Sequence, residues 1–102
     1  MKAQIFIDTD RIGEVELTII DESMGVLGGQ VIVLPNYQKY RLRVQQETNS
    51  KGGANSEDFP LRLINEKGFV LKAQGGVMLI DSPEFEELSV EVSGVNLSEL
   101  QM

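Results

Sequence analysis

The sequence contains no cysteine, no histidine and no tryptophan among its 102 residues. The missing thiol and imidazole groups exclude disulfides, cysteine nucleophiles, histidine bases and nearly all zinc, copper and haem ligation. No stretch approaches the eighteen or so consecutive apolar residues of a membrane-spanning helix. We therefore expect no cofactor, no metal site and no membrane span. The side chains left for catalysis are chiefly carboxylates, lysines and tyrosines.

Positive charge is also scarce. Nine Lys and Arg residues stand against sixteen Asp and Glu residues, which gives a formal net charge of −7. Nucleic acids and anionic membranes attract proteins through basic surfaces, so this balance argues against both as partners. The apolar stretch that follows Lys2 ends at Asp8, too early for the apolar core of a signal peptide, which predicts a cytoplasmic protein.

Alanine occurs only three times, whereas valine and isoleucine together reach eighteen, and branched side chains suit a pleated strand better than a helical turn. Alternation of apolar and polar residues, or a short apolar run, marks eight segments: 4–8, 14–19, 30–34, 40–45, 60–64, 69–73, 77–81 and 88–93. The sequence therefore predicts a single all-β domain over residues 1–102. Its architecture is expected to be a β-sandwich or a partly open barrel of seven or eight mostly antiparallel strands.

Polar segments separate these strands. Residues 8–11 and 65–68 have the composition of tight hairpin turns, and Gly68 can adopt the positive φ that closes such a turn. Residues 49–58 contain no large apolar side chain, so we expect a mobile surface loop there. One helical turn is expected at 82–87, and the tail 96–102 is expected to dock as a turn or to fray.

Each strand needs to bury one face, and the alternation selects which side chains form the core. The expected core residues are Ile5, Ile7, Val15, Leu17, Ile19, Val31, Val33, Leu42, Val44, Leu61, Leu63, Val70, Leu79, Val90 and Val92. The glycines at 25, 28 and 29 lack the spacing of a phosphate-binding loop and predict a bulge or bend instead.

Two segments 48 residues apart resemble each other at every apolar position. Residues 35–44 and 83–92 both begin with proline, and a glycine pair followed by an apolar strand precedes each of them. The similarity predicts two related four-stranded halves. The competing interpretation is that β-proteins reuse this simple pattern independently.

The polar positions of this repeat differ in charge. Lys39, Arg41 and Arg43 stand where the second segment has two glutamates and a serine, and alternation would place the three bases on one strand face. The two charged strands could pair with each other, within the chain or across a homodimer. Alternatively, the three bases and the neighbouring Tyr37 and Tyr40 form a ridge that recognises an anionic group of a partner protein. These five residues are the candidate partner-binding residues.

Two other groups of residues resemble a calcium-binding loop and a catalytic carboxylate pair. Residues 8–14 begin like a calcium loop, but Ile12 stands where the loop needs an oxygen ligand, so a hairpin turn is expected. Glu14 and Glu16 share a strand face and could form a carboxylate pair of the kind that cleaves glycosides. The same spacing suits two solvated side chains equally well.

No motif in the sequence identifies a specific function. The leading hypothesis is a non-catalytic protein-interaction module, or a small structural or adaptor subunit. It would bind a protein partner, or a second copy of itself, through an exposed strand edge or the charged strands. The alternative is a small-molecule-binding or carboxylate-dependent enzymatic domain, with its pocket between the sheets or beneath residues 49–58.

Overall fold

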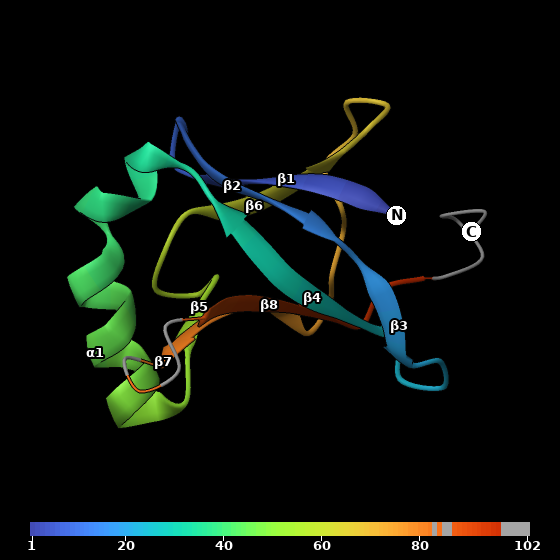
Figure 1. The fold of residues 1–102 in the computed structure, drawn as a ribbon. Helices are drawn as coiled ribbons and strands as arrows, with labels where there is room; N and C mark the ends of the chain where they lie inside the picture. Colours follow the sequence, from blue (N-terminus) through green and yellow to red (C-terminus); the bar gives the residue numbers. More distant parts are fainter. Residues whose placement is uncertain (83, 85–86, 97–102) are drawn as a thin grey trace.

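A computed structural model describes residues 1–82, 84 and 87–96. Its elements, in chain order, are β1 (Lys2–Ile7), β2 (Asp10–Glu16), β3 (Thr18–Asp21), β4 (Val26–Val33), the 3₁₀ helix η1 (Pro35–Lys39), α1 (Arg41–Lys51), β5 (Ala54–Asn55), β6 (Leu61–Asn65), β7 (Gly76–Ser82) and β8 (Glu87–Ser93). Mostly antiparallel strands form one curled, eight-stranded sheet, and η1 and α1 lie to one side of it (Figure 1). The predicted all-β fold is confirmed, in the form of a half-barrel.

The sheet follows the order β5-β7-β8-β4-β2-β1-β6, and β3 pairs with β4 beside this path. β4 lies in the middle of this order, and it changes partners along its length. Residues 27–30 pair with β8, whereas residues 31–33 pair with β2. Of the three glycines predicted to bend the chain, Gly28 and Gly29 lie just before this exchange, whereas Gly25 lies in the turn that precedes β4. A Cβ on Gly29 would lie 2.5 Å from the carbonyl oxygen of Glu16.

Both predicted hairpin turns are present. Asp8 turns the chain between β1 and β2 with a φ of 57°. Gly68 has a φ of 85°, and its N–H donates to the carbonyl oxygen of Asn65 at 3.0 Å. The strand predicted at 69–73 is wrong: this segment forms an isolated bridge between Ile64 and Val70 and two backbone hydrogen bonds to β6, but no strand.

The strand predicted at 40–45 is also wrong, since these residues lead into and begin α1. The apolar residues at 40, 42 and 44 alternate, but helical spacing selects a different set for burial. Tyr37 and Val44 are buried, whereas Leu42 is 70% exposed. The helix ends at Gly52, whose φ of 86° and N–H bond to the Thr48 carbonyl oxygen form a left-handed C-cap.

This helix removes the structural basis of the predicted repeat. Residues 35–44 form η1 and the start of α1, whereas the described part of the second segment belongs to β8. The two segments therefore share apolar positions without sharing a conformation. The prediction of two related four-stranded halves is wrong for these two segments, which were its main support. The expected turn at 82–87 and the tail 96–102 fall largely on residues outside those described.

The surface loop predicted at 49–58 is replaced by the end of α1 and by β5. Ala54 is 1% exposed and pairs with Leu79 of β7. Gly53 is buried so close to Met78 that an added Cβ would lie 2.4 Å from the Met78 Cγ. Small side chains thus allow this segment to pack against the sheet, although it offers no large apolar group.

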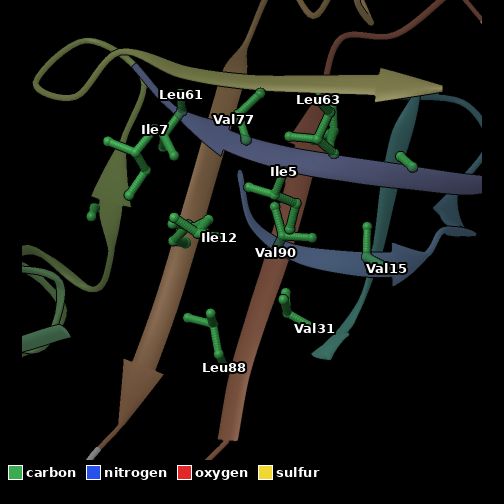
Figure 2. Packing of buried hydrophobic residues seen from close by; sticks show 14 of the residues in the cluster. Ile5, Ile7, Ile12, Val15, Val31, Leu61, Leu63, Val77, Leu88 and Val90 are labelled. Carbon is green, nitrogen blue, oxygen red and sulfur yellow. The ribbon is translucent and has the colours of Figure 1, made fainter. Parts of the chain in front are cut away.

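The core lies inside the curl, where side chains of β1, β2, β4 and β6 meet those of β7 and β8 (Figure 2). Most predicted core residues are buried there. The predictions that fail are Ile19, Val33, Leu42 and Val70, which are exposed. All four residues of β3 are exposed, which accounts for Ile19. None of the helices within the described residues is long and apolar enough to cross a membrane.

Candidate functional site

The five predicted partner-binding residues lie on η1 and α1 or between them, so the single strand face that was expected to align them does not exist. Tyr37 is fully buried. The Tyr40 hydroxyl donates a hydrogen bond to Oδ2 of Asp10, and Lys39 Nζ lies 3.5 Å from Oδ1 of the same carboxylate. The Tyr40 hydrogen bond lowers the pKa of Asp10 and raises the pKa of Tyr40.

The two predicted arginines also contact groups of the protein itself. The Arg41 guanidinium lies 5.4 Å from the centre of the Tyr37 ring, and that of Arg43 lies 4.4 Å from the centre of the Phe59 ring. At these distances a cation is attracted to the face of the ring. Each of the two arginines therefore contacts an aromatic ring of the protein itself: Arg41 a ring on η1, and Arg43 a ring between β5 and β6.

A buried carboxylate anchors the same helices. Asp81 of β7 is 4% exposed, and its Oδ2 accepts a 2.7 Å hydrogen bond from the Tyr37 hydroxyl. Gln45 Nε2 approaches Oδ1 at 3.5 Å, and the Asp81 backbone N–H donates to Thr48 Oγ1 at 3.0 Å. Burial, followed by the hydrogen bond to Asp81, raises the pKa of Tyr37. This buried cluster joins η1 and α1 to β7.

An open groove lies on the opposite face of the sheet from the core, over β1, β2, β4 and β6. Its volume is about 430 Å³, and Asn65, Glu66 and Gly68 form part of its wall. The side chains that shape it include Gln4, Phe6, Glu14, Glu16, Ile32 and Ile64. We call this surface the outer groove.

Strand register aligns four of these side chains in one row across the sheet. Ile64 pairs with Gln4, Gln4 pairs with Glu14, and Glu14 pairs with Ile32. Directly paired residues point to the same face of a sheet, so the row runs from an isoleucine on β6 to an isoleucine on β4. Ile32 is 68% exposed, and the bridge to Val70 extends the apolar end at Ile64. The outer groove therefore has apolar ends and a polar centre.

Negative charge dominates the polar part of the outer groove. Glu14, Glu16 and Glu66 line it together with one base, Lys2. Oε1 of Glu16 lies 3.4 Å from the amino group of Met1. Across the described residues, the carboxylates of Glu14 and Glu66 have neither an ion pair nor a hydrogen bond. Two carboxylates are thus available to a ligand.

The arginines nearest the groove are already occupied. Arg11 Nη1 donates to Gln4 Oε1 at 3.2 Å. Arg62 Nη2 donates to the carbonyl oxygen of Asp8 at 2.8 Å, and its guanidinium lies 5.5 Å from the centre of the Phe6 ring. Neither guanidinium forms an ion pair or hydrogen bond with Glu14, although Arg11 binds Gln4, the residue that pairs directly with Glu14. The Glu14 carboxylate at the centre of the groove therefore remains unpaired within the part of the chain that the structure describes.

Sequence reasoning found part of this site. It placed Glu14 and Glu16 on one strand face, which the structure confirms, but it missed Ile32 and Ile64. The signal for Ile32 was the uninterrupted run of apolar residues 31–33, which must put at least one apolar side chain on the outer face. Within residues 1–82, 84 and 87–96, no three carboxylates gather closely enough to hold a metal ion.

Comparisons of the chain with protein-family models, with curated proteins and with solved structures find no match. The features of this chain that bear on its function are those of the outer groove. The relevant features are the volume of about 430 Å³, the exposed isoleucine and the unpaired carboxylates.

Proposed function

We propose that this protein is a non-catalytic protein-interaction module whose binding surface is the outer groove. The row Ile64–Gln4–Glu14–Ile32 carries the proposal, because it combines apolar side chains at both ends with an unpaired carboxylate between them. A partner that covers Ile32 gains about 25 cal/mol for each Å² of apolar surface removed from water. The carboxylate of Glu14 then selects the charge of the partner.

The exposure of the carboxylates favours binding over catalysis. Glu14 and Glu16 are both exposed in an open groove. A carboxylic acid that acts in catalysis near neutral pH is commonly placed in an apolar, desolvated pocket that tunes its affinity for a proton. Two hydrated carboxylates are better suited to recognising a cationic side chain.

A small-molecule ligand is the second candidate for the same site. The groove volume of about 430 Å³ lies in the range of small-ligand pockets, roughly 300–1,000 Å³. The mixed lining would suit an amphiphilic cation. Such a ligand would depend on Ile32 and Glu14 as a peptide does, so the two candidates are separated by the class of compound that binds.

A display library of random 12-residue peptides, selected on the full chain, tests the proposal. Selected peptides are then compared on Ile32→Ser and on the matched control Leu42→Ser, because Ile32 is 68% exposed and Leu42 is 70% exposed on α1. We expect enriched peptides that lose binding to Ile32→Ser and keep binding to Leu42→Ser. Peptides that bind both variants equally, or a library that yields no binder, would contradict the proposal.

A thermal-shift screen of small amphiphilic cations separates the second candidate from the first. If no selected peptide depends on Ile32 but a small cation stabilises the wild type and not Ile32→Ser, the small-molecule function replaces the proposed one. Circular dichroism of both serine variants confirms that they fold before either result is interpreted.

A further inference from the structure

We infer that the outer groove binds an extended segment of another protein in which a lysine or arginine lies midway between two large apolar residues, in the order apolar-x-basic-x-apolar. This inference rests on the proposed function. It specifies the chemistry and spacing of the partner at the same site.

The spacing follows from the row across the sheet. Ile64 and Ile32 are separated by three strand-to-strand steps, which is about 14 Å at roughly 4.8 Å per step. In an extended chain, residues i and i+4 point to the same side and lie about 13 Å apart. A segment that crosses the strands can therefore place one apolar residue on Ile64 and the other on Ile32.

The same crossing places the central residue over the polar part of the row. Residue i+2 of an extended segment shares the face of i and i+4 and falls about 7 Å from each. Gln4 and Glu14 occupy this position between the two isoleucines. A helical segment fits less well, because residues i and i+4 are separated by only about 6 Å along a helix axis.

Charge complementarity assigns a basic residue to the centre. The Glu14 carboxylate has no partner in the part of the chain that the structure describes, and the oxygen of Gln4 already accepts a hydrogen bond from Arg11. A lysine or arginine between the isoleucines would bond to Glu14, with Glu16 and Glu66 nearby. An acidic residue at the same place would meet these carboxylates and be repelled.

A second copy of the chain does not meet these requirements. No segment of the sequence has a lysine or arginine midway between two large apolar residues at this spacing. The net charge of −7 also opposes self-association and attracts a cationic partner. The exposed strand β3 is a weaker docking surface, because a register shift interrupts its pairing and Asp21 lies on it, both of which discourage edge pairing.

Fluorescence anisotropy with three labelled synthetic peptides tests the inference on the full chain at low salt. The matched peptide is Gly-Ser-Leu-Ser-Lys-Ser-Leu-Ser-Gly. The second has the same composition with both leucines adjacent, and the third has glutamate in place of lysine. We expect the matched peptide to bind at least about tenfold more tightly than either control, and to weaken as salt is added.

Protein variants locate the binding. Glu14→Gln and Ile32→Ser should each weaken the matched peptide at least about fivefold. Their matched controls, Glu57→Gln and Leu42→Ser, should leave it unchanged. Glu57 is an exposed acid beyond β5, at the other end of the sheet from the outer groove.

The results distinguish failure of this inference from failure of the proposed function. The inference is overturned if the matched peptide fails to bind, if the rearranged peptide binds as tightly, or if Glu14→Gln has no effect. If library peptides depend on Ile32 but lack the apolar-x-basic-x-apolar order, the proposed function stands and only this inference fails. If no peptide of either experiment depends on Ile32, both are contradicted.

Discussion

The hydroxyl of Tyr37 donates a 2.7 Å hydrogen bond to Oδ2 of Asp81, although 44 residues separate them in the sequence. Both residues are buried, and the bond joins η1 to β7. The bond gives Asp81, a buried carboxylate, a close donor at the boundary between helix and sheet. The position of α1 therefore depends on a polar contact as well as on apolar packing.

Replacing Tyr37 with phenylalanine should lower the free energy of unfolding by about 1–3 kcal/mol, because Asp81 then loses a donor without regaining water. Urea denaturation followed by circular dichroism measures the change. Tyr40→Phe provides the matched control and should cost less, since its acceptor Asp10 is partly exposed and also pairs with Lys39. Equal losses in the two variants would show that the Tyr37–Asp81 bond has no special role.

Alkaline pH should destabilise the protein through its tyrosines. Burial raises the pKa of Tyr37, and the hydrogen bond to Asp10 raises that of Tyr40, so the neutral side chains favour the fold. This contribution is complete below the unfolded tyrosine pKa of about 10 and is lost as the pH rises through the folded pKa values. Because the chain has two tyrosines and no tryptophan, absorbance at 295 nm reports their ionisation cleanly. Tyrosinate should form above pH 10 together with loss of structure; ionisation of both tyrosines near pH 10 in a folded protein would contradict the account.

Alanine at Gly29 should disturb the exchange of partners in β4. An added Cβ would lie 2.5 Å from the Glu16 carbonyl oxygen and 2.9 Å from Val15 Cγ2, so a neighbouring strand has to move. We expect Gly29→Ala to cost about 1–3 kcal/mol in urea denaturation. Gln30→Ala, at the next and exposed position of β4, should change stability by less than about 0.5 kcal/mol. A stability of Gly29→Ala equal to that of wild type would mean that the strands separate there at little cost.

Strands that alternate strictly were predictable from the sequence, and β8 is the clearest example: Leu88, Val90 and Val92 are buried. The error at 40–45 arose because alternation also describes part of a helical pattern there. Tyr37 and Val44 are buried, whereas Leu42 is exposed to solvent. Which side of α1 becomes buried depends on its packing against β7, a strand that is distant in the sequence. Pro35 and Gly52, at the first position of η1 and the end of α1, were the local signals for a helix.

The outer groove was only half predictable for a related reason. Glu14 and Glu16 lie on one strand, so their common face follows from sequence alone. Ile64 and Ile32 join them through pairings of β1 with β6 and of β2 with β4, which connect distant parts of the chain. Local alternation does not determine which strands become neighbours, so the row was visible only in the folded sheet.

Mapping the bound peptide on the protein tests the central claim most directly. Amide chemical shifts of the ¹⁵N-labelled chain are recorded while Gly-Ser-Leu-Ser-Lys-Ser-Leu-Ser-Gly is added. We expect the largest shifts at Gln4, Glu14, Ile32 and Ile64, with α1 nearly unchanged. Shifts centred on Arg41 and Arg43, or spread evenly over the surface, would contradict the assignment of the outer groove as the binding site.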